Sequence, residues 1–144
     1  METNLQRACR LLDAGDYTCV VCGENQVYTT TSRGVAPLLS WLDSDTSLQG
    51  FSAADRVVGR GAAFLYCLLG VREVYARIMS QPAAQVLQEH GIGVSAGTFV
   101  PGIINRKGDG PCPFEAAVMD IRDPREALTA IRETRRQLQG GNRS

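Results

Sequence analysis

The residues best suited to chemistry lie together in the segment Cys112-Pro113-Phe114-Glu115. Proline is favoured at the first position of a helix, which places Cys112 at the N-cap and Glu115 near the third helical position. The dipole at this end of a helix lowers the pKa of a thiol and favours the nucleophilic thiolate. The segment is therefore a candidate catalytic site, with Cys112 as nucleophile and Glu115 orienting a substrate.

The chain offers no evident partner for a Cys112 nucleophile. His90 is the sole histidine, and it ends a predicted helix, where a histidine cation is favoured by the dipole. We interpret His90 as a cap of that helix. An ordinary capped helix, with a small cysteine in a tight turn, remains the alternative interpretation of residues 112–115.

A second candidate site surrounds the start of an apolar helix predicted over 61–69. Asp55 and Arg60 bracket this start, and the first N–H groups of a helix have no partner within it. Such an end binds anions, so Arg60 and the amides would hold a phosphate or carboxylate while Asp55 positions a hydroxyl or an amine. The alternative is that Asp55 caps the helix and Arg60 pairs with Asp55.

Further polar residues at loop-to-helix junctions could complete an anion pocket. In layered α/β sheets, ligands collect where strands end and helices begin. A basic residue on a loop is usually only solvated, but beside a helix N-terminus it contributes to anion binding. The predicted ligand-binding set is therefore Arg33, Asp55, Arg60, Ser80, Asn105 and Arg106.

The five cysteines give little support for a metal or for disulfides. Cys19 and Cys22 form a C-x-x-C within a predicted strand and turn, and no second pair follows. A structural zinc needs four ligands, and a redox C-x-x-C normally opens a helix. We therefore interpret both cysteines as buried strand and turn residues and predict no cofactor.

Composition narrows the class of protein. A chain of 144 residues fits one domain, here predicted over 1–139 with a flexible tail over 140–144. Its 15 basic and 15 acidic residues argue against a partner that is a nucleic acid or an anionic membrane. Residues 1–4 show no leader signal, and the apolar stretch 61–69 is about half of the ~20 residues that span a bilayer. We expect a soluble cytoplasmic protein.

Hydrophobic periodicity predicts alternating helices and strands, which favours a layered α/β fold. The helix over 61–69 has no polar face, so we expect it to be buried between two layers. Residues 101–113 show no period and form a long loop. The predicted helices are 4–12, 35–42, 61–69, 83–90, 114–121 and 124–138, and the predicted strands are 17–21, 26–30, 74–78 and 94–100.

Several stretches resemble the family known as domain of unknown function 1893, small bacterial and archaeal proteins of the cytidine-deaminase-like superfamily. The similarity covers residues 17–131 and implies a three-layer α/β/α sandwich with a mixed sheet, without an established activity. Where the family usually carries lysine this chain has Arg56 and Arg60, and arginine stays protonated and cannot act as a base. The stretches that carry the resemblance are 32–39, 55–63, 74–76, 100–106 and 112–115.

The resemblance also indicates where zinc deaminases hold their metal. The first ligand and the proton-shuttling glutamate would fall in Gly59-Arg60-Gly61, and the two cysteine ligands at Ala83 and Val86. None of these side chains can ligate zinc or serve as the glutamate. The resemblance thus implies a zinc-free member.

Three functions remain open at this point. The first is a zinc-free domain that binds a small anionic, nucleotide-like ligand. The second is an enzyme that uses Cys112 for acyl transfer or redox chemistry. The third is a structural subunit without a ligand, which associates through an apolar helix face. A symmetric homodimer is the expected assembly.

Overall fold

The computed structural model describes residues 2–105 and 107–141, which contain a five-stranded mixed sheet in the order β2-β1-β3-β4-β5. β1 is antiparallel to both β2 and β3, whereas β3, β4 and β5 are parallel. The strands are β1 (Cys19–Cys22), β2 (Val27–Thr30), β3 (Ser52–Val58), β4 (Glu73–Ser80) and β5 (Gly93–Val100). The helices are α1 (Asn4–Ala14), α2 (Ala36–Asp43), α3 (Arg60–Leu69), α4 (Gln81–Glu89), α5 (Pro113–Ala117) and α6 (Pro124–Gly141).

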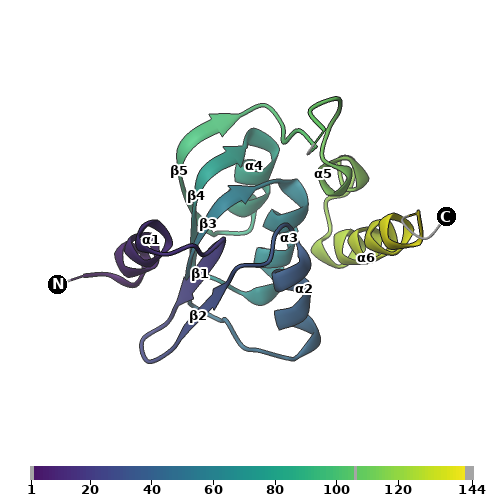
Figure 1. Ribbon diagram of the computed structural model, residues 1–144. Coiled ribbons are helices and arrows are strands. Elements are labelled where there is room, and N and C mark those ends of the chain that lie inside the picture. Colours follow the sequence, from purple (N-terminus) through teal and green to yellow (C-terminus); the bar gives the residue numbers. More distant parts are fainter. Residues whose placement is uncertain (1, 106, 142–144) are drawn as a thin grey trace.

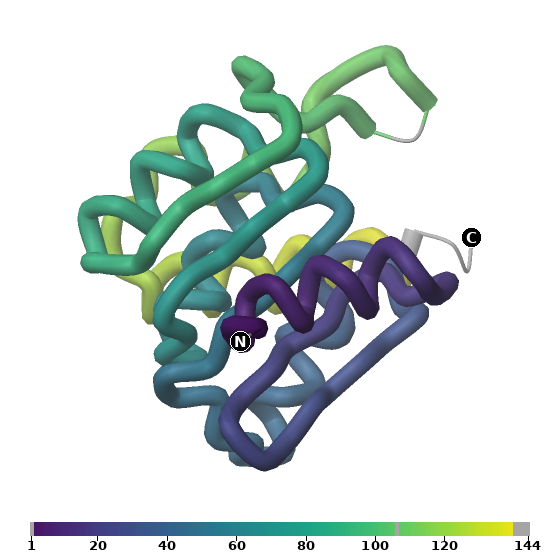
Figure 2. Tube along the Cα trace, turned by 90° about the vertical axis from the view of Figure 1, so that its left-hand side faces the viewer, coloured from purple at the N-terminus to yellow at the C-terminus, as the bar shows by residue number. Residues whose placement is uncertain are grey.

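The helices cover the two faces of the sheet unequally. α1 lies on one face, whereas α2, α3 and α4 cover the other, and α6 packs outside α3 (Figure 1). Figure 2 shows α1 crossing in front of the sheet, where it packs on β1 and β3 and does not reach β5. The predicted α/β/α sandwich with a mixed sheet is confirmed.

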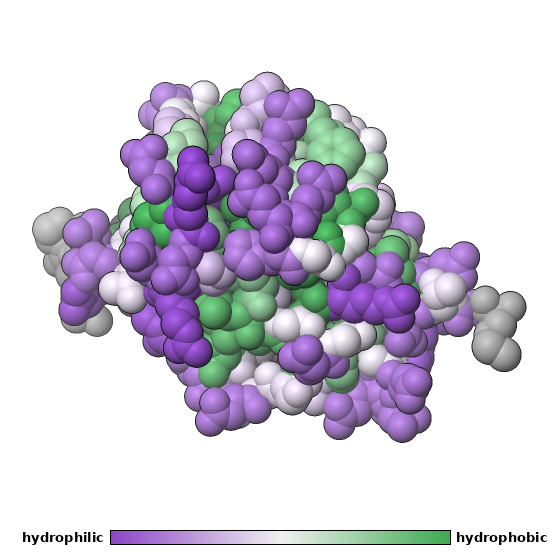
Figure 3. All heavy atoms as spheres, turned by 180° about the vertical axis from the view of Figure 1, so that it is seen from behind, coloured by the Kyte–Doolittle hydropathy of each residue, from purple (hydrophilic) through white to green (hydrophobic). Residues whose placement is uncertain are grey.

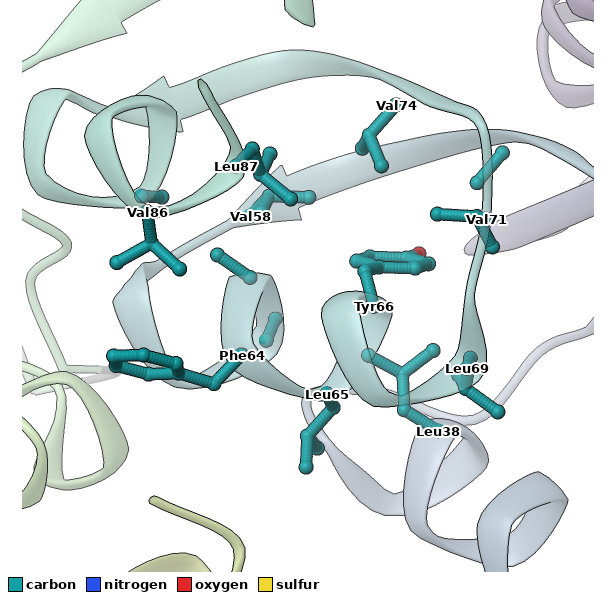
Figure 4. Close-up of a cluster of buried hydrophobic side chains, with 14 of the residues drawn as sticks. Leu38, Val58, Phe64, Leu65, Tyr66, Leu69, Val71, Val74, Val86 and Leu87 are labelled. Atoms are coloured by element: carbon teal, nitrogen blue, oxygen red, sulfur yellow. The ribbon is translucent and has the colours of Figure 1, made fainter. Parts of the chain in front are cut away.

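α3 is the helix around which the layers assemble. It contacts β3 on one side and α6 on the other, which explains why its sequence has no polar face. In the close-up, Tyr66 points toward the strands while Leu65 points away from them (Figure 4). Both side chains are fully buried, as expected for a helix between two layers.

The central strand β3 was missed by the sequence analysis. Its segment Ser52-Ala53-Ala54-Asp55 is poor in the β-branched and aromatic residues that favour strands. Pairing with β1 on one side and β4 on the other holds it extended. Ala53 packs toward α3 and Ala54 toward α1, so small side chains allow helices to approach both faces.

Two predicted helix boundaries were wrong. The helix predicted over 114–121 is only the five-residue α5 and ends before Val118. α6 continues through Gly141, two residues into the segment 140–144 that was assigned to a tail; residues 142–144 lie outside the described residues.

The surface resembles that of an ordinary folded domain. Seen from behind, polar side chains dominate, with hydrophobic residues visible between them (Figure 3). Within residues 2–105 and 107–141, none of the helices has the length and apolar character needed to cross a membrane.

Candidate functional site

A pocket of about 320 Å³ lies where β3 ends and α3 begins. Carboxyl ends of parallel strands are the usual place for ligands in α/β sheets. The walls are mainly apolar and include Val35, Val57, Ala62, Ile103 and Phe114.

The structure brings only part of the predicted set into this pocket. Among the predicted residues, the pocket is lined by Arg33, Asp55, Cys112 and Glu115.

The other members of the set lie elsewhere. Arg60 and Ser80 both donate hydrogen bonds to Glu115 instead of lining the pocket. Asn105 bonds Asp109 within its own loop, and Arg106 lies outside the described residues.

The carboxylate of Glu115 is buried, with 3% of the residue exposed. Its Oε2 accepts from the backbone N–H of Arg60 at 2.7 Å and from the hydroxyl of Ser80 at 2.6 Å. Its Oε1 accepts from the N–H of Ile103 at 2.6 Å. Arg60 opens α3 and Ser80 caps α4, so one carboxylate joins the N-termini of two helices. The anion expected at the start of α3 is supplied by the chain itself.

Two glycines permit this close approach. A Cβ at Gly59 would lie 3.0 Å from Oε2 of Glu115, and one at Gly102 would lie 3.3 Å from Oε1. These contacts are tight for a carboxylate held by hydrogen bonds. Sequence reasoning singled out Arg60, Ser80 and Glu115 separately. Their spacing along the chain gave no sign that Glu115 would bind the other two.

Arg60 uses its side chain to bind backbone carbonyl groups. Its Nε donates to the carbonyl of Val118 at 2.9 Å and its Nη2 to that of Ile121 at 2.7 Å. The guanidinium also lies 5.2 Å from the ring centre of Phe64. The alternative in which Asp55 caps the helix and pairs with Arg60 is wrong, because the N-cap is Gly59, the first N–H donates to Glu115, and the guanidinium of Arg60 binds carbonyl groups.

Asp55 is held by a neutral neighbour. The hydroxyl of Tyr66 donates to its Oδ2 at 2.6 Å, and Sγ of Cys19 lies 3.2 Å from that hydroxyl. Burial raises the pKa of Asp55 to about 6, although the bond from Tyr66 acts in the opposite direction. No ion pair within the described residues includes Asp55.

The cysteines have separate roles. Cys112 is partly buried, lines the pocket and caps α5 without a side-chain hydrogen bond. Nδ1 of His90 lies 2.8 Å from the carbonyl of Val86 at the end of α4, so this ring is engaged away from Cys112.

Cys19 and Cys22 are buried in different hydrophobic clusters, which confirms their interpretation as buried residues of the strand. No group of three metal-ligating side chains occurs in the part of the chain that the structure describes.

We expect Glu115→Ala to lower the free energy of unfolding by about 3 kcal/mol, because three buried donors lose their acceptor. Urea unfolding measures the loss. Formate or acetate at about 0.1 M should restore part of it relative to chloride, since a small carboxylate can occupy the vacated position. The exposed Glu126→Ala is the control, with an expected loss below about 1 kcal/mol. A Glu115→Ala protein as stable as wild type would contradict the role of this carboxylate.

Asp55 should give the folded state a distinct pH dependence. Its pKa is about 6 when folded and near the ordinary 3.8 when unfolded, so between these values the folded state keeps a proton that the unfolded state has released. The stability that Asp55 contributes therefore falls as pH rises from about 4 to 6 and is constant above. The stability difference between wild type and Asp55→Asn should fall by up to about 3 kcal/mol across this window. Urea unfolding at stepped pH measures it, and a flat difference would show that the carboxyl is not perturbed.

Comparison with known proteins places the chain among relatives of the same size. A DUF1893 family protein from Thermotoga maritima has a similar crystal structure, with a TM-score of 0.81, 25% sequence identity, and coverage of 95% of this chain and 92% of that one. A weaker likeness, with a TM-score of 0.42 and 17% identity, is to the dCMP deaminase of cyanophage S-TIM5 and covers 54% of this chain and 77% of that one. The comparison with curated proteins gives no match. Residues 7–134 match the family described as "Domain of unknown function (DUF1893)", and the chain belongs to this family.

Proposed function

We propose that the domain binds a small anionic, nucleotide-like ligand in the pocket beside Asp55. The observation that carries the proposal is the position of Asp55, a carboxyl with a raised pKa in a mainly apolar pocket at the end of a central parallel strand. Pockets of this kind, with perturbed titratable groups, are typical of binding sites.

The cation for the anionic end of the ligand is Arg33. This residue lines the pocket and is exposed. Arg60 is not available for that role, because its guanidinium binds the carbonyl groups of Val118 and Ile121. The first N–H of α3 is not available either, because Glu115 accepts from it.

We propose further that the domain works without zinc. The positions that the deaminase resemblance assigns to metal ligands hold Gly59, Ala83 and Val86, and the last two are fully buried. Between the same two helix starts lies the carboxylate of Glu115, bonded to both. Three donors of the protein already occupy most of the hydrogen-bonding positions of this carboxylate, which leaves little capacity for a metal.

An enzyme that uses Cys112 is the alternative function for the same pocket. It is favoured by the presence of Cys112 among the lining residues. Two observations weaken it: α5 has only five residues, and the ring of His90 is engaged with Val86. The binding proposal needs no chemistry from Cys112, so a Cys112→Ala variant separates the two.

Homodimer formation is proposed at β5. This strand forms one edge of the sheet, and its eight residues include no charge and no proline, the usual protection of a free edge. Phe99 on this strand is 48% exposed. Antiparallel pairing of two copies about a two-fold axis at Gly97 places Ser95 of one copy opposite Phe99 of the other. A strand that pairs with itself in this way closes into a symmetric dimer.

A thermal-shift screen tests the binding proposal. Millimolar nucleotides, sugar phosphates and carboxylates should raise Tm, because a ligand that binds only the native state stabilises it. Arg33→Ala should weaken such hits by about tenfold, as expected for the loss of a charged contact. Arg125→Ala, at an exposed site on α6, and Cys112→Ala should not. Absence of hits, or hits insensitive to Arg33, would remove the proposal, and hits lost only in Cys112→Ala would favour the enzyme.

Elemental analysis tests the second proposal. Protein purified without chelator should contain far less than one zinc per chain, and added chelator should leave Tm unchanged, because no zinc contributes to folding. About one tightly held zinc per chain, with a loss of Tm on chelation, would overturn this expectation.

Light scattering tests the dimer. The wild-type mass should be twice that of the 15.6 kDa chain. Ser95→Lys combined with Phe99→Lys should give a monomer, because facing lysines repel across the paired strands. Thr129→Lys, at an exposed position of α6, is the control. A wild-type protein of monomer mass at high concentration would contradict the pairing.

A further inference from the structure

Two carboxylates line the same pocket but differ in how their charge is satisfied. Glu115 accepts from two backbone N–H groups and one hydroxyl, which include the first amide of α3. The dipole of that helix also favours a negative charge at this end. Glu115 is therefore compensated within the protein.

Asp55 is surrounded by neutral donors, which include the backbone N–H groups of Arg56 and Val57, and burial still raises its pKa to about 6. Its side-chain hydrogen bond comes from the hydroxyl of Tyr66, a neutral group. Burial raises the pKa of both Tyr66 and Cys19 well above their ordinary values, so neither neighbour supplies charge at neutral pH. Arg56 lines the pocket too, but its Nε donates to the carbonyl of Tyr17 at 2.8 Å. None of the groups that donate to Asp55 is a cation, so its carboxylate form lacks a charged partner.

We infer that Asp55 binds a protonated nitrogen of the ligand, an amine or an amidinium-type group carried on an apolar ring. The inference rests on the proposed function and narrows its ligand to a zwitterion, whose anionic end lies at Arg33. A cationic N–H donor makes a charge-assisted hydrogen bond to the carboxylate and removes the cost of an unpaired charge in an apolar wall. Val35, Val57 and Phe114 supply the apolar contacts for the ring. A volume of about 320 Å³ suits a single ring with small substituents.

The pairing should depend on pH through Asp55. The other titratable or charged groups around it are Cys19 on β1, Tyr66 on α3, and Arg33, Arg56, Cys112 and Glu115 along the pocket. Because the pKa of Asp55 lies at about 6, the carboxylate form dominates at pH 7.5 and is lost as the pH falls below 6. The affinity for a cation that does not itself titrate should fall with it.

Benzamidine and benzamide are matched probes for this inference. They have nearly the same shape, but only benzamidine is a cation, and it stays one between pH 5 and 8. Calorimetry or NMR titration of the full chain at pH 7.5 should show benzamidine binding at least about tenfold tighter than benzamide, the difference expected for a charge-assisted bond. Asp55→Asn should remove this preference, whereas Asp120→Asn, at an exposed position, should keep it.

The pH arm uses the wild-type chain and so does not depend on the folding of a variant. Benzamidine affinity should fall by about tenfold from pH 7 to pH 5, as a carboxylate with a pKa near 6 is protonated. Benzamide affinity should not change.

Equal affinity for the two probes, no binding of either, or benzamidine binding insensitive to both Asp55→Asn and pH would overturn the inference. In those cases nucleotide or sugar-phosphate hits that Arg33→Ala weakens would still uphold the proposed function, and their absence would remove both.

Discussion

The structure depends on one buried carboxylate. Glu115 receives hydrogen bonds from the start of α3, from the cap of α4 and from Ile103, so it joins segments that are far apart in the sequence. A buried charge without donors would be strongly destabilising, and here helix amides supply them in place of a basic side chain. The side chain of Arg60 adds a second link between the start of α3 and the segment after α5, because it binds the carbonyl groups of Val118 and Ile121.

The hydrogen bonds of Glu115 also determine which groups of the pocket remain available to a ligand. Glu115 takes the first amide of α3, and its negative charge disfavours a phosphate at that helix start. The other carboxylate along the pocket is Asp55, which accepts from the neutral hydroxyl of Tyr66. Two carboxylates in one pocket thus have different tasks: one holds the framework together, and we propose that the other faces a ligand. Their environments, and not their residue types, separate these tasks.

The sequence predicted most elements because their patterns are local. The apolar α3, the hairpin of β1 and β2, and the short α2 all follow from periodicity and turn residues. β3 was missed because Ala53 and Ala54 have low strand propensity and are held extended by neighbours distant in sequence. The site was predicted in part for the same reason. Asp55 and Cys112 were predicted from their nearness to helix starts, although Asp55 lies within β3. The bonds of Glu115 and Arg60 join segments distant in sequence, so local spacing does not reveal them.

Gly59 makes the local backbone and the geometry of Glu115 depend on one another. A Cβ at this position would stand 3.0 Å from Oε2, so any larger residue requires the carboxylate to shift by a few tenths of an ångström. The same carboxylate accepts from Arg60, Ser80 and Ile103, so such a shift would strain three hydrogen bonds at once. A glycine without a side chain thereby controls the relative position of two helices and a loop.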